Sequence, residues 1–293
     1  MKKGLILNNA YSTLKSSLNQ SARLKDEFAK LGVQIDVKPN NFFPATIEDG
    51  NIKSKVCGYD FCIYLDKDKY ISDMLEKSGL RLFNSHKAIC DCDDKMVTSI
   101  RLANLGVKMP ETIPGFLCYD PDAKIQTSAL DYIEGELGYP VVVKTSYGSL
   151  GKGVFKADDR GGLYKIMEEV KCIPHLFQQF IKESSGTDLR VIAVGGKCVA
   201  AMKRTAENDF RSNIELGGKG EKFELSDDIK NLCKKVSEAL GLDYCGIDIL
   251  FGKDGPLVCE VNSNAFFGGI EGVTKANVAA CYAEYIYGKI YLK

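Results

Sequence analysis

The pattern of apolar and polar positions in the first third of the chain predicts strands that alternate with helices. Lys3–Asn8 is a short apolar run that ends in a polar residue, which is typical of a buried parallel strand. Ser12–Lys30 has leucines and a phenylalanine at helical spacing and is expected to form an amphipathic helix. The alternation continues with strands at Val33–Val37 and Tyr59–Leu65, a helix over Lys69–Lys77 and a short apolar segment at Leu80–Phe83. This order favours a small parallel α/β domain, which we expect at residues 1–84.

Beyond residue 84 the pattern changes to shorter strands, hairpins and helices, and we expect two further domains at residues 85–181 and 182–293. The elements expected in the first of these are a helix over Cys92–Val107 and strands at Tyr139–Lys144, Val154–Lys156 and His175–Ile181. In the second, Asp188–Val194 and Lys197–Arg204 are expected to pair as an antiparallel hairpin. The last helices are expected over Asp227–Leu240, where Ser226 is the cap, and over Thr274–Tyr287.

The segment Tyr244–Asn264 contains two strand-like runs that flank a turn rich in glycine. If residues 253–255 form a three-residue loop, Gly252 faces Pro256, and Asp248 then falls opposite Glu260. The two carboxylates are therefore expected to lie on one face of the same hairpin.

Asn262 shares the face of Glu260, because side chains alternate along a strand. Two opposed carboxylates repel each other unless a cation lies between them. Carboxylate and amide oxygens are hard ligands that suit Mg²⁺ or Mn²⁺. The hairpin thus predicts a metal site at Asp248, Glu260 and Asn262; the alternative is two exposed acids on a solvated face.

A loop with three glycines follows the strand that ends at Lys144. Gly148, Gly151 and Gly153 can bring backbone N–H groups close to a phosphate, because glycine has no side chain in the way. The spacing is neither that of a P-loop nor that of a dinucleotide-binding fingerprint. A flexible hairpin turn is the alternative, but a lysine at a strand end beside such a loop is well placed to meet phosphate charge. We therefore predict phosphate binding by Lys144 and this loop.

Composition and charge exclude several classes of function. The 293 residues carry 39 Lys plus Arg and 39 Asp plus Glu, so no overall field points to a nucleic-acid or membrane partner. No apolar run approaches the roughly 18 residues of a membrane-spanning helix, and the first residues lack the pattern of a signal peptide. The eleven cysteines are scattered without a CxxC pair, so a reduced, cytoplasmic protein is expected. His86, near a helix start, is expected to be structural.

The order of the motifs along the chain resembles the ATP-grasp superfamily, and within it the RimK-like glutamate ligases. The likeness is carried by VVVK, the glycine loop, QQFI, DLRV, FRSN, GIDIL and CEVNSN, and it covers about residues 84–290. It implies an α/β and α+β fold, in which an N-terminal parallel pre-ATP-grasp domain precedes two α+β subdomains that clamp ATP. It also implies a reaction in which a carboxylate is phosphorylated to an acyl phosphate. An amine then attacks this intermediate to give an amide, ADP and phosphate.

The resemblance also implies roles for single residues. Two Mg²⁺ (or Mn²⁺) ions would be held by Asp248, Glu260 and Asn262. The residues expected to contact ATP are Lys95, Lys144, Gly148, Gly151, Gly153, Gln178, Gln179, Phe180, Asp188, Arg211, Ser212 and Asn213. Of these, the lysines would meet the phosphates, Gln179 and Phe180 the adenine, and Asp188 the ribose. The position two before Asp248 is an arginine in the D-alanine ligase branch and is Gly246 here, so Arg211 is the expected catalytic residue that stabilises the acyl phosphate.

The expected function is an ATP-dependent carboxylate–amine ligase that adds glutamate or another amino acid to a peptide, a protein or a small molecule. The expected partners are ATP, a carboxylate and an amine, with homo-oligomers common in the family. Lys203, Arg204 and Lys275 are expected to hold substrate carboxylates. Many relatives continue the EVN motif into Pro-Gly, whereas SNAFFGG follows Asn262 here, so the acceptor class stays open. The alternatives are an inactive nucleotide-binding regulatory protein, a carboxylate–thiol ligase, or a kinase that stops at the phosphate.

Overall fold

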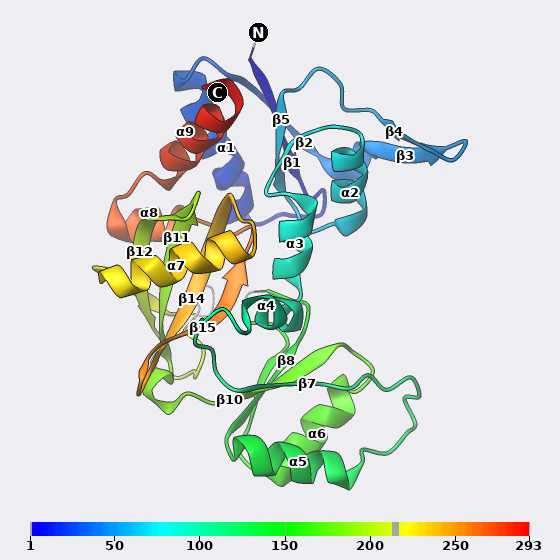
Figure 1. Cartoon of the computed structure of the whole chain (residues 1–293), viewed down its shortest axis with the longest axis vertical. Helices are drawn as coiled ribbons and strands as arrows, with labels where there is room; N and C mark the ends of the chain where they lie inside the picture. Colours follow the sequence, from blue (N-terminus) through cyan, green and yellow to red (C-terminus); the bar gives the residue numbers. More distant parts are fainter. Residues whose placement is uncertain (1, 150, 213–216, 293) are drawn as a thin grey trace.

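The computed structural model describes residues 2–149, 151–212 and 217–292 (Figure 1). Its first sheet is parallel, with strand order β2-β1-β5-β6. The elements are β1 (Lys3–Asn8), α1 (Lys15–Lys30), β2 (Gln34–Pro39), β5 (Phe61–Leu65), α2 (Lys69–Lys77) and β6 (Leu82–Phe83). The predicted alternation of strands and helices is confirmed, since β1 and β5 are buried runs with helices beside them. The sequence did not predict η1 (Asn40–Phe42) or the hairpin of β3 (Ala45–Glu48) and β4 (Asn51–Ser54), which projects from this sheet.

A second sheet is antiparallel, has the order β7-β10-β8-β9, and forms the lobe at the bottom of Figure 1. Its elements are β7 (Thr112–Pro114), α5 (Thr127–Leu137), β8 (Val141–Thr145), β9 (Val154–Ala157), α6 (Arg160–Val170) and β10 (His175–Gln179). The two helices cover one face, where Leu130 and Leu163 pack with Phe177 in one apolar cluster. The sequence analysis missed α6, although Asp159 caps it by accepting a hydrogen bond of 2.7 Å from the Gly162 amide.

A third sheet is antiparallel and lies between the other two, with the order β13-β12-β11-β14-β15. Its elements are η2 (Lys182–Ser184), β11 (Thr187–Val194), β12 (Lys197–Thr205), β13 (Lys219–Lys222), α7 (Asp227–Ala239), β14 (Tyr244–Gly252), β15 (Gly255–Asn262), α8 (Gly268–Thr274) and α9 (Val278–Tyr291). Successive side chains of β11 point to opposite faces of this sheet. Val191 packs with Val236 of α7 on one face, and Ile192 packs in the cluster that holds Tyr282 of α9 on the other.

Two expected helices are wrong in their bounds. The helix expected over Cys92–Val107 is divided into α3 (His86–Asp93) and α4 (Lys95–Leu102), because Asp94 is extended and accepts hydrogen bonds from the amides of Met96 and Val97. The helix expected over Thr274–Tyr287 begins later, at Val278, and continues to Tyr291. Before it, α8 ends at Thr274, Lys275 has a φ of 62°, and Asn277 caps α9.

The hairpin of β14 and β15 has the predicted pairing, but its loop differs from the prediction. Gly252 pairs with Gly255 and not with Pro256, so the loop holds only two residues, Lys253 and Asp254. A β-bulge then shifts the register between Asp248 and Ile249, and this shift restores the pairing of Asp248 with Glu260. Cys259 is the extra residue at the bulge, since Val258 pairs with Ile249.

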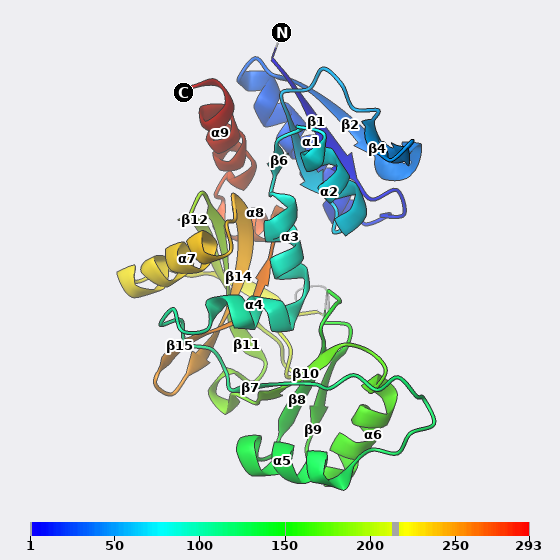
Figure 2. The ribbon, with the colours of Figure 1, turned by 45° about the vertical axis from the view of Figure 1, so that its right-hand side comes forward.

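The C-terminal helix α9 lies beside α1, so both ends of the chain are at the same end of the molecule (Figures 1 and 2). One apolar cluster joins Phe28 of α1, Phe61 of β5 and Tyr282 of α9. The predicted domain boundaries therefore stay a prediction, because this cluster includes residues on both sides of position 84. None of the helices in the described residues combines the length and the apolar character needed to cross a membrane.

Candidate active site

A cavity of about 440 Å³ lies where the three larger sheets meet. The first sheet contributes Asn9 and Asp66, which follow the carboxyl ends of β1 and β5. The second contributes Lys144, Gln178, Gln179 and Phe180 from the ends of β8 and β10, and the third contributes Asp188, Arg190, Arg204, Asp248, Glu260 and Asn262. The cavity thus collects side chains that are far apart in the sequence.

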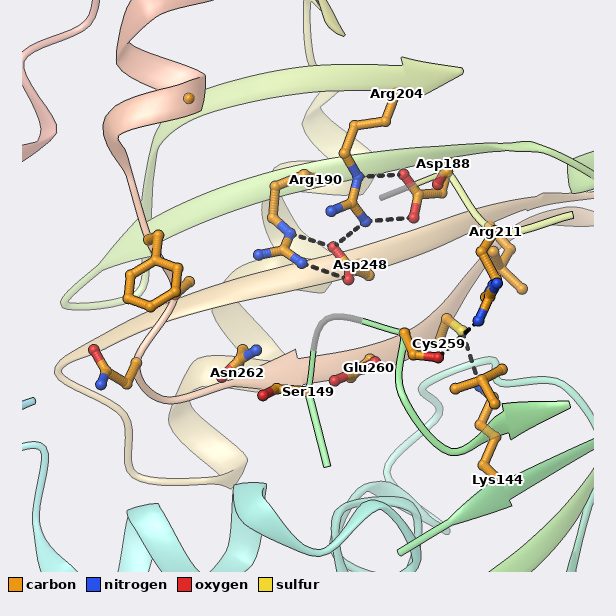
Figure 3. Close-up of a pocket in the computed structure, with 18 of the residues that line it drawn as sticks. Lys144, Ser149, Asp188, Arg190, Arg204, Arg211, Asp248, Cys259, Glu260 and Asn262 are labelled. Atoms are coloured by element: carbon orange, nitrogen blue, oxygen red, sulfur yellow. Dashed lines mark hydrogen bonds and ion pairs between the residues drawn. The ribbon is translucent and has the colours of Figure 1, made fainter. Parts of the chain in front are cut away.

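Four charged side chains form the floor of the cavity on β11, β12 and β14 (Figure 3). Arg190 donates to both oxygens of Asp248, from Nε to Oδ1 and from Nη2 to Oδ2, the latter at 2.7 Å. Arg204 donates from Nε to Oδ1 of Asp188 at 2.7 Å, and its Nη2 lies 3.0 Å from Oδ1 of Asp248. Asp248 is therefore shared by two arginines, whereas Arg204 is shared by two aspartates.

The pKa values of the two aspartates reflect this arrangement. Burial by itself raises the pKa of Asp248, but Arg190 and Arg204 together outweigh it and hold this pKa below its ordinary value. Burial and the neighbouring charge of Asp248 raise the pKa of Asp188, against the effect of Arg204. Asp248 is thus the more firmly ionised of the two carboxyls.

The predicted metal ligands lie on adjacent strands, and their chemistry fits a divalent cation. Asp248 pairs directly with Glu260, and Asn262 lies two residues further on β15, on the same face. Oδ1 of Asn262 is buried and has no hydrogen-bond partner among the described residues. An orphaned amide oxygen beside two carboxylates is the ligand set that Mg²⁺ prefers. The described part of the chain holds no group of three His, Cys, Asp or Glu side chains that could bind a metal ion, and the predicted set has two carboxylates and one amide.

Lys144 projects from the end of β8 towards the third sheet. It is buried, and Nζ donates to Oε1 of Gln178 at 2.6 Å and to Sγ of Cys259 at 3.3 Å. Cys259 reaches Lys144 because it is the extra residue of the β-bulge (Figure 3). Burial raises the pKa of the Cys259 thiol, although the Lys144 ammonium opposes the shift. The sequence analysis missed Cys259, since a bulge cannot be read from alternation alone.

Lys95 lies at the start of α4 and holds the glycine loop. Its amide donates to the carbonyl of Ser146 at 3.0 Å, and Nζ donates to the carbonyl of Gly148 at 3.1 Å. Burial lowers the pKa of Lys95, and the carboxylate of Glu260 opposes this shift. Lys95 does not line the main cavity; it lines a small adjoining void together with Glu260. Its predicted contact with phosphate stays a prediction.

The glycine loop depends on backbone conformations that favour glycine. Gly148, Gly151 and Gly153 have φ values of 134°, 74° and 72°. A Cβ on Gly153 would lie 2.2 Å from Oγ1 of Thr145. Gly151 lines the cavity, and its carbonyl accepts a 2.9 Å hydrogen bond from Nη1 of Arg211.

Most of the other predicted ATP contacts line the same cavity, and their roles stay predictions. Gln178, Gln179, Phe180, Asp188, Arg211 and Ser212 are lining residues, whereas Asn213 lies outside the described residues. Arg211 is also held by Asp209, with Nη2 and Oδ2 2.7 Å apart. Both oxygens of Asp188 accept hydrogen bonds from Arg204.

Two of the three basic residues expected to hold substrate carboxylates do not line this cavity. Lys203 lies on the opposite face of β12 from Arg204 and faces Glu221 at 3.5 Å. Lys275 donates to the carbonyl of Gly272. The sequence analysis missed Arg190, although it stands two residues after Asp188 and so must share its face of β11.

Comparison with known proteins fits this geometry. Residues 92–286 match the profile of the RimK-like ATP-grasp domain. The chain belongs to the RimK-like ATP-grasp family. The predicted resemblance and fold class are confirmed.

Named relatives of this RimK-like protein are ligases and synthases. It is 37% identical over 262 residues to mouse N-acetylaspartylglutamate synthase A, covering 87% of this chain and 64% of the relative. It is 37% identical over 257 residues to human beta-citrylglutamate synthase B, covering 82% and 65%. The chain thus spans less than two thirds of the length of these two synthases. A probable alpha-L-glutamate ligase of Maridesulfovibrio salexigens is 35% identical over 214 residues, covering 72% and 68%.

Solved structures show the same fold at low sequence identity. A RimK domain ATP-grasp protein from Sphaerobacter thermophilus superposes with a TM-score of 0.74 at 18% identity, covering 97% of this chain and 98% of that one. D-alanine–D-alanine ligase from Bacillus anthracis, complexed with ATP, gives a TM-score of 0.75 at 17% identity, covering 100% and 98%.

Proposed function

We propose that this RimK-like protein is an ATP-dependent carboxylate–amine ligase that acts through an acyl phosphate. The observation that carries the proposal is the meeting, in one cavity, of a glycine loop, a buried lysine, and two paired carboxylates beside an orphaned amide oxygen. Phosphoryl transfer requires positioning and charge neutralisation, and no protein nucleophile is needed. The lysine, the carboxylates suited to a metal ion and the glycine loop of this cavity could supply both.

The nucleotide would lie between the second and third sheets. Gln179 and Phe180 would flank the adenine, Asp188 would meet the ribose, and Lys144 and Arg211 would neutralise phosphate charge. Asp248, Glu260 and Asn262 would hold one or two Mg²⁺ or Mn²⁺ ions, which when bound screen the phosphates and stabilise the charge that develops on them. The sequence prediction that Arg211 also stabilises the acyl phosphate is kept as part of this proposal.

Two bond exchanges make up the reaction. An oxygen of the substrate carboxylate attacks the γ-phosphorus of ATP, the bond to the β-phosphate oxygen breaks, and ADP leaves. The amine nitrogen then attacks the acyl carbon, the C–O bond to phosphate breaks, and the nitrogen loses a proton. Asn264 and Asp66 also line the cavity. Their oxygens are suited to accept N–H groups of the amine, and Oδ1 of Asn264 is buried without a partner among the described residues.

The names of the relatives suggest the first substrates to test. We propose L-glutamate as the amine, and N-acetyl-L-aspartate, citrate and a peptide carboxylate as candidates for the carboxylate. We also keep, as predictions, a cytoplasmic location and a homo-oligomer, which light scattering would test.

The test is ADP release that depends on both a carboxylate and an amine. Asp248→Asn and Glu260→Gln each remove one metal-binding charge and are expected to lower the rate by at least about 100-fold. Glu221→Gln is a matched control, since Glu221 faces Lys203 outside the cavity, and it should retain the wild-type rate. Mass spectrometry of the product separates an amide from a thioester or an accumulated acyl phosphate. Retained ligation in both site variants would overturn the metal assignment.

A further inference from the structure

We infer that Arg190 binds the substrate carboxyl group and the acyl phosphate formed from it, and that a divalent metal ion makes Arg190 available by taking Asp248. This inference rests on the proposed ligase function, and it names a residue and an order of events that the function alone does not require. Three observations on the guanidinium of Arg190 support the inference: its position in the cavity, its pairing with Asp248 and its free donor Nη1.

Arg190 is one of the four charged side chains of the cavity floor. It pairs across β11 and β14 with Asp248, lines the cavity, and keeps 14% of its side chain exposed. Nε and Nη2 both donate to Asp248, whereas Nη1 makes no hydrogen bond to any residue that the structure describes (Figure 3). The free edge of this guanidinium is therefore available to an anion.

Gly246 makes room for this guanidinium. A Cβ at position 246 would lie 3.1 Å from Nη1 of Arg190 and 2.5 Å from Cβ of Ala265. Any larger residue would push Arg190 out of its present place or displace the segment that follows Asn264. Ala265 and Asn264 also line the cavity, so the free Nη1 lies near this part of its lining.

The other two arginines of the cavity would each keep a partner if Asp248 were withdrawn. Arg204 is buried, and it is held by both oxygens of Asp188 as well as by Asp248, so it retains a full ion pair when Asp248 is withdrawn. Arg211 is held by Asp209 and by the carbonyl of Gly151. Arg190 has Asp248 as its one acidic partner among the described residues.

A divalent ion at Asp248 would therefore leave Arg190 without a counter-charge. A largely buried guanidinium that loses its carboxylate is costly, and the cost is removed when another oxyanion takes its place. The planar fork of arginine matches a carboxylate or a phosphate in two-point geometry. The substrate carboxyl group, which carries negative charge before and after phosphorylation, is the oxyanion that this site would take.

The inference predicts opposite effects of one substitution on two ligands. In Arg190→Met, Mn²⁺ binding should become tighter by at least about tenfold, because a competing cation beside Asp248 has been removed. Binding of inorganic phosphate in the presence of Mn²⁺ and ADP should weaken by at least about tenfold, because its two-point partner is gone. Mn²⁺ binding is measured by electron paramagnetic resonance with and without ADP, and phosphate binding by titration calorimetry.

Two further variants make the result specific. Arg190→Lys keeps the charge but loses the fork, so phosphate binding should be intermediate between wild type and Arg190→Met. Arg81→Met is the matched control, since Arg81 pairs with Asp243 at 3.3 Å outside the cavity and should alter neither affinity. Thermal melts of all variants confirm that they are folded.

An unchanged or weaker Mn²⁺ affinity in Arg190→Met would overturn the exchange at Asp248, because Arg190 would then only orient the carboxylate. Unchanged phosphate affinity would overturn the role in substrate binding. Neither measurement needs turnover. If no carboxylate and amine pair releases ADP, the proposed ligase function fails while the Mn²⁺ and phosphate titrations still decide the role of Arg190.

Discussion

At the residue scale, three glycines determine the shape of the loop after β8. Their φ values lie in the region that side chains rarely adopt, and two of them have close neighbours. A Cβ on Gly148 would lie 3.1 Å from the carbonyl of Lys152, and one on Gly153 would lie 2.2 Å from Thr145. The backbone can therefore approach a ligand here only because these positions lack side chains.

Gly153→Ala is expected to weaken nucleotide binding by at least about tenfold, since the strain and the contact with Thr145 displace the loop. Gly135→Ala is the matched control. Gly135 lies within α5 with no atom within 4 Å of its added Cβ, so this change should raise stability by up to about 1 kcal/mol and leave binding unchanged. Calorimetric titration with ADP and thermal melts measure the two effects. Wild-type affinity in Gly153→Ala would show that the loop does not contact the nucleotide.

At the scale of elements, the break between α3 and α4 positions a lysine. Asp94 ends one helix and caps the next by accepting hydrogen bonds of 2.9 Å and 3.1 Å from the amides of Met96 and Val97. The next residue, Lys95, then donates from its amide to Ser146 and from Nζ to Gly148. The cap thus connects the start of α4 to the base of the glycine loop.

Asp94→Ala should lower stability by about 1 kcal/mol through loss of the cap, and it should also weaken ADP binding. Asp159→Ala removes the corresponding cap of α6, where Asp159 accepts from the amide of Gly162. We expect a similar loss of stability there and no change in ADP binding, because α6 does not line the cavity. Chemical denaturation and calorimetry separate the effects. If Asp94→Ala and Asp159→Ala bound ADP equally well, the connection between the cap of α4 and the glycine loop would be contradicted.

At the scale of the whole molecule, the C-terminal helix holds the first sheet against the third. A polar junction supplements the apolar cluster between α1 and α9. Glu27 of α1 accepts from Nζ of Lys30 at 2.8 Å, from Nδ2 of Asn277 at 3.0 Å and from Nη1 of Arg23 at 3.2 Å. Asn277 also caps α9. The three expected domains are 1–84, 85–181 and 182–293. We propose that the first and the last unfold together, because this junction connects them.

The junction gives a pH dependence of stability. Hydrogen bonds from Lys30 and Asn277, with a contribution from Arg23, lower the pKa of Glu27 from 4.5 to about 2, although burial opposes the shift. A carboxyl whose pKa is lower in the folded state stabilises the protein above its unfolded pKa, and this contribution is lost as the pH falls from 4.5 towards 2. Glu27→Gln should therefore cost up to about 3 kcal/mol at pH 7, and the difference from wild type should shrink below pH 4.5.

Urea denaturation of both proteins at pH 7, 5, 4 and 3 would measure this effect, with urea midpoints compared at each pH. Glu221→Gln serves as the control, because Glu221 is on the exposed edge strand β13 and no described residue other than Lys203 pairs with its charge. If the stability difference between wild type and Glu27→Gln stayed constant from pH 7 to pH 3, ionised Glu27 would not be the source of the pH dependence.

The sequence by itself determined most of the strands, the helices α1, α2 and α7, and the sharing of one face by Asp248, Glu260 and Asn262. Hydrophobic periodicity reports which side of an element is buried, and alternation along a strand reports which side chains share a face. The same reasoning applied to β11 would have placed Arg190 beside Asp188. The sequence also carried the family motifs, because each lies within one short segment.

Only the tertiary structure decided which faces meet. The pairing of Asp248 with Glu260 depends on a bulge at Cys259, which compensates for a loop one residue shorter than expected. Lys144 meets Cys259, and α9 lies against α1, through contacts between segments more than 100 residues apart. Periodicity in one segment contains no information about its partner, because sheet order and register are set by the packing of the whole chain.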